Sequence, residues 1–229
     1  IKHTRNILHK KRFQLVFCSY ICTMDDKKME FISKALEVYM RYGIKSVTMD
    51  EMARQVGVSK KTIYQYVKDK NDLVEQCITC AQMMDEELIK IIITQNDNAI
   101  DEVLAISKYI GEELKKVHPS IFFDLSKYHP KAMNMIKCHK DNFIRDCVKD
   151  NLVKGIEQGF YRENMNVDII SKVYLTTMDH VLAGDIFDRS KISTDEVYSD
   201  VFRYHIRGIA SEKGITYLTE KIKNNQIKL

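Results

Sequence analysis

Two short helical segments that meet at one glycine constrain this chain more than any other feature. Residues 48–66 read TMDEMARQVGVSKKTIYQY, with apolar residues at helical spacing on both sides of Gly57. Thr48 followed by Glu51 forms a capping-box pattern, which predicts where the first helix begins. Gly57 can adopt a positive φ without steric cost, and Ser59 can cap the second helix. The sequence therefore predicts two helices folded tightly around Gly57.

The spacing also predicts which side of the second helix faces solvent. A helix pair that crosses steeply needs a small residue at the crossing and an apolar residue that faces back from the second helix. Ala53 and Ile63 supply these two residues. The opposite face offers donors, acceptors and two cations but no carboxylate: Lys60, Lys61, Thr62, Tyr64, Gln65 and Tyr66.

Such a face suits the major groove of double-stranded DNA. Lysine can reach O6 and N7 of guanine, glutamine can pair with N6 and N7 of adenine, and hydroxyls can bind phosphates. Lys45, Lys68 and Lys70 flank the face and could hold the DNA backbone. A net charge of +4 is mild, so a nucleic-acid contact has to come from this local patch. The alternative is the solvated polar face of an ordinary helical bundle.

The rest of the chain favours helices throughout. Its 229 residues include only 2 prolines and 8 glycines, and no run alternates as a strand would. We predict a first helix from Asp25 to Tyr42, with Tyr42 on its inward face, and a long fourth helix from a cap at Asp69 to about residue 96. Further helices are predicted at 99–117, between His118 and Pro130, at 130–159, 167–187 and 194–213, and after Gly214.

This order of elements predicts an all-α fold. Three short helices would form an N-terminal bundle with a helix-turn-helix, and the long fourth helix would join it to a larger C-terminal helical domain. We expect residues 24–70 to be the DNA-binding domain and residues 71–229 to be the ligand-binding and dimerisation domain.

Residues 1–23 look different from the rest of the chain. They hold basic residues followed by the apolar run FQLVFCSYIC, an order that imitates a signal peptide or membrane anchor. That run of about ten residues is short of the ~20 that a bilayer span needs. We therefore expect a non-native or disordered extension before Met24, no membrane partner, and a place in the bacterial cytoplasm.

Residues 28–73 resemble the N-terminal domain of TetR-like transcriptional regulators of bacteria. The stretch TMDEMARQVGVSKKTIYQYVKDKNDL has the capped helix, the A…GVS turn, the T-[LI]-Y-x-Y element and the K-x-x-L of that family. Val67 departs from the pattern, since the family usually has Phe there. The resemblance implies a regulator, most simply a repressor, that binds a palindromic operator as a homodimer and is released by a small-molecule effector.

The resemblance also implies roles for single residues. Thr48 and Lys70 would meet phosphates at two helix N-termini, and Tyr64 and Tyr66 would press on the DNA backbone. The residues that would read or approach bases follow the cap residue Ser59: Lys60, Lys61, Thr62 and Gln65.

In that family the last two long helices usually build the dimer, and the larger domain often holds a ligand. Each of the residues named next could equally belong to the core of a single chain. The expected dimer residues are Tyr174, Met178, Val181, Leu182, Val201, Tyr204, His205 and Gly208. A small apolar or aromatic effector would lie among Met83, Tyr109, Phe122, Phe123, Tyr128, Met133, Phe143 and Tyr174.

No residue pattern indicates an enzyme, a cofactor or a metal site. Cys77-x-x-Cys80 lies in a helical stretch without a second cysteine pair, and the histidines form no H-x3-H pair. We therefore expect no catalytic residues. One alternative keeps the fold and the DNA contact but has no ligand: an architectural or nucleoid-associated protein. An apolar cavity in the larger domain would favour the regulator, and a solidly packed domain would favour the alternative.

Overall fold

The computed structural model describes residues 26–183, residue 187 and residues 191–224. The extension predicted for residues 1–23 lies outside these described residues. Within them the chain is helical, and no β-strand is formed. The all-α class predicted from the sequence is confirmed. No helix in this part of the chain combines the length and apolarity needed to cross a membrane.

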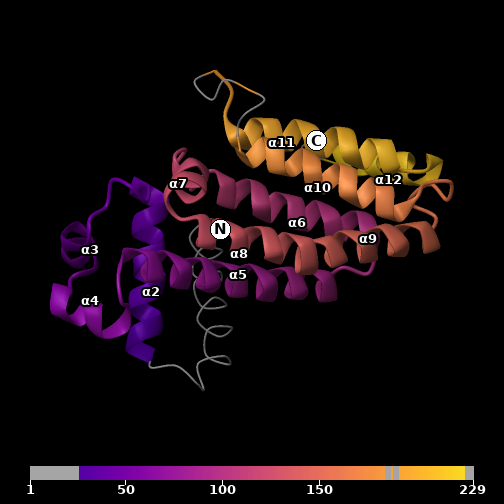
Figure 1. Cartoon of the computed structure of the whole chain (residues 1–229). Coiled ribbons are helices and arrows are strands. Elements are labelled where there is room, and N and C mark those ends of the chain that lie inside the picture. The colour runs from indigo at the N-terminus through magenta and orange to yellow at the C-terminus, as the bar shows by residue number, and fades with distance from the viewer. Residues whose placement is uncertain (1–25, 184–186, 188–190, 225–229) are drawn as a thin grey trace.

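A small helical bundle lies at one end of the molecule and a larger body at the other, with one long helix running between them (Figure 1). The bundle comprises α2 (Asp26–Tyr42), α3 (Met49–Val56) and α4 (Lys60–Tyr66), and α5 (Lys70–Gln95) is the long helix. The body follows as α6 (Ala99–Leu114), α7 (Ile121–Tyr128), α8 (Pro130–His139), η2 (Lys140–Ile144), α9 (Arg145–Glu157), α10 (Val167–Ala183), α11 (Thr194–Ile209) and α12 (Glu212–Lys223).

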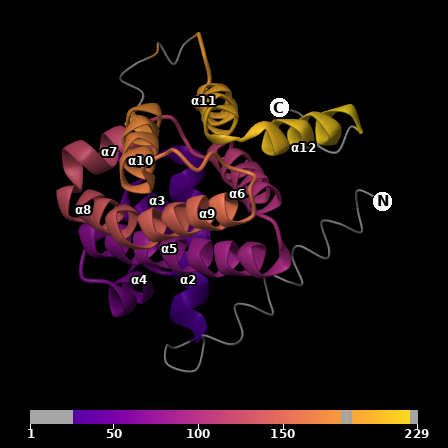
Figure 2. The same cartoon turned by 90° about the vertical axis from the view of Figure 1, so that its right-hand side faces the viewer.

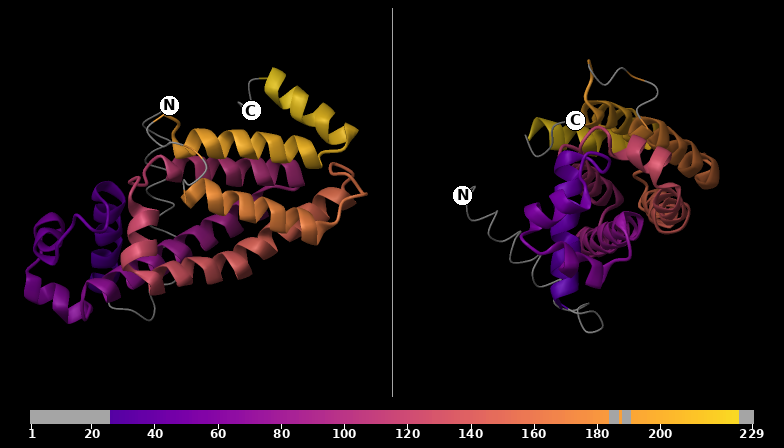
Figure 3. Two further views of the ribbon diagram at one scale, coloured as in Figure 1. Left: turned by 45° about the horizontal axis from the view of Figure 1, so that its top comes forward. Right: turned by 60° about the vertical axis from the view of Figure 1, so that its left-hand side comes forward.

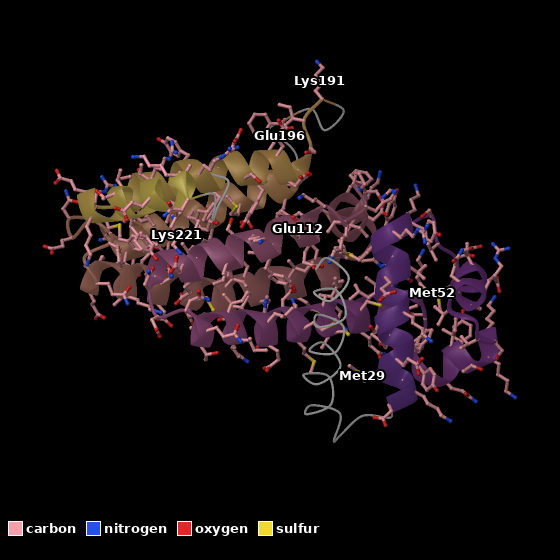
Figure 4. All side chains as sticks on the ribbon, turned by 180° about the vertical axis from the view of Figure 1, so that it is seen from behind. Met29, Met52, Glu112, Lys191, Glu196 and Lys221 are labelled. Carbon is pink, nitrogen blue, oxygen red and sulfur yellow. The ribbon has the colours of Figure 1, made fainter. Side chains whose placement is uncertain are left out.

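The core of the bundle forms where α2 crosses α3 and α5. Phe31 and Ala35 are buried, as the helical spacing predicts, and Met52 lies fully buried between α3 and α2 (Figure 4). The prediction for Tyr42 is wrong: its side chain is exposed, and Tyr39 is buried in its place. The helical period of 3.6 residues allows either Tyr39 or Tyr42 on the inward face at the end of α2. The crossing with α5 buries the row of residues spaced by four, which contains Tyr39.

Two helices differ from their predicted bounds. The helix predicted over 130–159 is one continuous rod, but it carries a π-helical turn, η2, between α8 and α9 (Figure 3). The helix predicted over 194–213 ends earlier, at Ile209, because Ala210 forms a β-bridge with Tyr161. The chain then restarts as α12, where a Cβ on Gly214 would overlap the carbonyl oxygen of Phe160.

The body is layered. α5 forms one side, α6 with α8 and α9 form the middle, and α10, α11 and α12 form the opposite side (Figures 1 and 2). A buried carboxylate, Glu102 on α6, binds the middle layer together by accepting from Asn151 Nδ2 at 2.8 Å and Lys154 Nζ at 2.8 Å on α9. Lys221 Nζ lies 2.6 Å from Asp101 Oδ1 and attaches α12 to α6 (Figure 4).

The packing of α10 against α11 makes the stability of the fold sensitive to pH. The His205 ring stacks on Tyr174 with 4.1 Å between ring centroids, and burial lowers the pKa of His205 to about 4. An unfolded histidine has a pKa of about 6.5, so as the pH falls the unfolded chain takes up this proton before the folded chain does, and the folded state loses stability. We expect this one residue to lower the free energy of unfolding by about 2 kcal/mol between pH 7.5 and pH 5.

His205→Phe tests this expectation, because it keeps a stacking ring and removes the titration. Urea unfolding of both proteins at pH 7.5 and pH 5 should show a smaller loss of stability for the variant. Equal losses in the two proteins would contradict a neutral, half-buried His205.

Candidate nucleic-acid interface

The turn between α3 and α4 has the geometry that its glycine predicts. Gly57 adopts φ 77° and ψ 32° in the left-handed region. The backbone N–H groups of Gly57 and Val58 both donate to the carbonyl of Ala53 at 3.0 Å, which closes the end of α3. No atom lies within 4 Å of a Cβ built on Gly57, so its backbone conformation alone requires glycine there.

Both helices of the pair begin at side-chain caps. Thr48 Oγ1 accepts from the backbone N–H of Glu51 at 3.1 Å, and Ser59 Oγ accepts from that of Thr62 at 3.0 Å. The hydroxyls of Ser59 and Thr62 also lie 2.7 Å apart. These caps fix where α3 and α4 start, and therefore which side chains of α4 point outward.

Ile63 packs the inner side of α4 against the core of the bundle. Its side chain is 0% exposed in the core of the bundle, and Val67, at the end of α4, is buried as well. Lys61, Tyr64 and Gln65 are exposed on the other side of the helix. Among the described residues, Lys61 and Gln65 have neither an ion pair nor a side-chain hydrogen bond, so both are available to a ligand.

Lys60 is exposed but has a partner. Its Nζ lies 2.9 Å from Asp50 Oδ1 on α3, and this ion pair raises the pKa of Lys60. Both side chains are open to solvent, where such pairs hold weakly and exchange readily for other anions. A phosphate could replace Asp50. The sequence does not show this pair, since it joins residues ten positions apart across the turn.

Two of the nine side chains predicted to contact DNA face into the protein. Tyr66 stacks on Phe31 of α2 with 5.6 Å between ring centroids. Lys70 Nζ donates to the carbonyl of Val47 at 2.7 Å, and burial lowers its pKa. Their predicted DNA contacts stay predictions. In the isolated chain they stabilise the bundle and the loop between α2 and α3.

The comparisons with known proteins agree with this geometry. Residues 31–77 match the sequence model of the bacterial regulatory proteins of the tetR family. The chain is TetR-like. The HTH-type transcriptional regulator YvaF of Bacillus subtilis is 23% identical over 174 residues, which cover 73% of this chain and 88% of that protein.

Solved structures show that the likeness in fold extends over most of the chain. A regulator from Saccharomonospora viridis, solved with choline, is 14% identical and covers 82% of this chain and all of its own at a TM-score of 0.65. FadR from Bacillus subtilis, solved with stearoyl-CoA, is 19% identical. The match covers 79% of this chain and 98% of the FadR chain, with a TM-score of 0.56. The family match over residues 31–77 and the similarity to HTH-type transcriptional regulators support the description of this TetR-like protein as a DNA-binding regulator of transcription.

The side chains predicted to bind an effector line neither of two hollows that the described residues form. Phe123 and Tyr128 are exposed on α7, and Lys45 lies over the Tyr128 ring at 4.9 Å. Tyr109 donates to Asp85 inside the body, where burial raises the pKa of the Asp85 carboxyl. Five more of them are half-buried, each on a different element (α5, α7, α8, η2 and α10): Met83, Phe122, Met133, Phe143 and Tyr174. These two open hollows, of about 680 and 340 Å³, lie against α12.

The predicted dimer residues divide into an inner and an outer set. Val181 is buried in the chain itself, and Tyr174, Met178, Leu182, Val201 and His205 are half-buried. Tyr204 is 84% exposed and Gly208 is exposed beside it. Two exposed residues on α10, Ile169 and Val173, extend this set. We use the name outer α10–α11 face for a set of residues on these two helices, which contact each other: Ile169 and Val173 of α10 and Val197, Val201, Tyr204 and Gly208 of α11.

The two cysteines of the Cys-x-x-Cys pattern have the surroundings of packing residues. Cys77 and Cys80 are buried in the bundle core, and burial raises the pKa of both thiols, which keeps them protonated and unreactive. No group of three or more His, Cys, Asp or Glu side chains that could hold a metal ion occurs in the described part of the chain.

Proposed function

We propose that this TetR-like protein regulates transcription by binding a palindromic operator as a homodimer, most simply as a repressor, and that a small-molecule effector releases it. The observation that carries the proposal is the face of α4. Lys61, Tyr64 and Gln65 are exposed and free of ion pairs with the rest of the described chain, while Ile63 behind them is fully buried. A helix that presents donors outward from a fixed turn suits the major groove.

Residues 24–70 would bind DNA, and residues 71–229 would bind the effector and the partner copy. The protein would act in the bacterial cytoplasm, where promoter DNA is found. One helix of seven residues reads few bases, so specificity needs two copies whose helices lie about 34–36 Å apart, one turn of DNA. The outer α10–α11 face supplies an apolar surface for that second copy.

Selection of bound fragments from random double-stranded DNA tests the proposal most directly. We expect an enriched palindrome whose half-sites are about one helical turn apart. Enrichment of a non-palindromic site would contradict the dimer, and the absence of any enriched sequence would contradict sequence-specific regulation.

The effector is tested on the operator obtained in this way. Two structural relatives were solved with stearoyl-CoA and with choline, so acyl-CoA thioesters and quaternary ammonium compounds are reasonable first probes. We expect one class of small molecule to weaken the operator complex at saturating concentration. If none of a broad panel does so, the effector part of the proposal fails, and the architectural alternative explains the DNA contact better.

Lys61→Ala should weaken binding to the selected operator by about 1–3 kcal/mol, because a lysine that reaches a base edge contributes that much discrimination. The same change should weaken binding to random DNA much less. A matched control is Lys108→Ala, which removes an exposed lysine from α6 in the body. Titration of labelled operator and random duplexes at one salt concentration measures both effects. Equal affinities for Lys61→Ala and Lys108→Ala would show that α4 does not read the operator.

A further inference from the structure

A buried carboxylate on α7 accepts hydrogen bonds from the loop that leads into α3 and α4. Residues 43–47 connect α2 to Thr48, the cap of α3. Asp124 on α7 is only 3% exposed, and its Oδ2 accepts from the backbone N–H groups of Ile44 at 3.1 Å and Lys45 at 2.9 Å. Ile44 is buried, so its N–H group would lack a partner without this oxygen.

The carboxylate is itself held in place by the start of α7. Ser120 Oγ lies 3.0 Å from Asp124 Oδ2 and donates to it. The Nδ1 atom of His118 accepts from the backbone N–H of Ser120 at 3.2 Å, and the backbone N–H of His118 donates to the carbonyl of Met40 on α2 at 2.8 Å. The segment before α7 therefore contacts both the end of α2 and the loop that follows it.

The approach of α7 to the loop is close enough to restrict the residue at its first position. Gly43 has φ +81°, and a Cβ built on it would lie 2.6 Å from Ser120 Oγ. Backbone conformation and contact with α7 thus both require glycine at this point. At Gly57 the conformation alone makes this demand.

The other side of the loop is held by α5. Lys70 Nζ donates to the carbonyl of Val47 at 2.7 Å, and the negative charge of Asp124 favours the ammonium form of Lys70. His129, at the end of α7, pairs its Nδ1 with Asn71 Oδ1 on α5 at 2.7 Å. The loop backbone is therefore hydrogen-bonded both to a carboxylate of α7 and to the ammonium group of a lysine on α5.

The apolar contacts of α7 support the same connection. Ile121 and Leu125 lie in one continuous core with Met52 of α3 and Leu73 of α5. A displacement of α7 within the body must consequently move the loop or break its hydrogen bonds. Interiors are close-packed, so small shifts are transmitted rather than absorbed.

We propose that Asp124 is a positioning residue for DNA binding: through the backbone of residues 44 and 45 it fixes where α3 begins, and hence the angle at which α4 meets DNA. This inference rests on the proposed DNA-binding function. The contact of α7 with the loop would couple the larger body to α3 and α4, in addition to the covalent connection through α5. Asp124 itself touches no DNA.

Asp124→Ala tests the role in the full-length protein. We expect its affinity for the selected operator to fall about tenfold at a temperature well below unfolding, a change typical of coupling between two sites. Asp124→Asn retains one acceptor oxygen at the same place and should recover most of the affinity. The matched control is Asn151→Ala, which removes a buried polar side chain that donates to Ala99 and Glu102 in the body, remote from the loop.

Amide hydrogen exchange of the DNA-free proteins supplies the second measurement. In Asp124→Ala the amides of Ile44 and Lys45 should exchange at least about tenfold faster, while those inside α3 and α4 stay protected. In Asn151→Ala the loop amides should exchange at the wild-type rate. This comparison separates loss of the loop anchor from general destabilisation.

Each failure has its own signature. If the wild type enriches no DNA sequence, the proposed function fails, and the exchange rates of Ile44 and Lys45 alone then show whether Asp124 holds the loop. If the wild type binds its operator and Asp124→Ala binds as tightly as Asn151→Ala, the positioning role is overturned. Unchanged exchange at Ile44 and Lys45 would also overturn it.

Discussion

Val173→Asp should leave the protein folded but monomeric, with operator affinity lowered at least about 100-fold. Val173 is 57% exposed in the single chain, so a carboxylate there costs the monomer little. In a two-fold dimer built on the outer α10–α11 face, each copy would bury this charge next to its counterpart, and an unpaired buried charge costs several kcal/mol. Loss of the dimer removes the linkage between half-sites, which accounts for the large effect on binding.

Val153→Asp provides the matched control, because Val153 is 43% exposed on α9, a helix that contributes no residue to the outer α10–α11 face. It makes the same chemical change on a different helix. Sedimentation equilibrium measures the dimer, and titration of labelled operator measures DNA binding. If Val173→Asp and Val153→Asp are both dimeric and bind equally well, the dimer forms through another surface.

Gly155→Ala is the second change with a large expected effect, a loss of about 3 kcal/mol or more in the free energy of unfolding. A Cβ on Gly155 of α9 would overlap the ring of Tyr161, which is 1% exposed. The Tyr161 hydroxyl is also bonded to Asn151 Oδ1 at 3.0 Å and to the carbonyl of Ala99, so the ring cannot move aside without breaking these bonds. Overpacking at a site that cannot relax lies at the costly end of core substitutions.

Gly111→Ala is the control for helix propensity. Gly111 lies inside α6, and the nearest atom to a Cβ built there is Tyr198 Cε1 at 4.0 Å, an ordinary contact. This variant should gain up to about 1 kcal/mol, because alanine favours helices over glycine. Urea unfolding of the three proteins measures both changes. A stability of Gly155→Ala close to that of Gly111→Ala would show that α9 and Tyr161 separate easily.

The helix-turn-helix was predictable because its determinants are local. The caps Thr48 and Ser59, the turn at Gly57 and the inward position of Ile63 each depend on neighbours within one or two helical turns. Local rules of capping and spacing describe such contacts well. The same rules predicted the start of α5 at the cap Asp69, whose side chain accepts from the N–H of Asp72.

Predictions that depended on the path of another segment succeeded less well. Helical spacing could not choose between Tyr39 and Tyr42, and it did not indicate that Phe123 and Tyr128 are exposed on α7. Lys70 looked like one more flanking cation, although its ammonium group donates to a loop carbonyl. For Tyr128 and Lys70 the contacts are with Lys45 and Val47, which lie more than twenty residues away in the sequence.

The sequence by itself determined the all-α class, the reading helix and the resemblance to its family, since these follow from periodicity, caps and a glycine whose effects stay within a few residues. Only the tertiary structure decided that Asp124 grips the loop before α3, that α11 stops at Ile209, and that Val173 and Tyr204 remain uncovered in the single chain. Burial and hydrogen bonding between distant segments depend on how helices cross, and crossing is settled by the packing of all of them together.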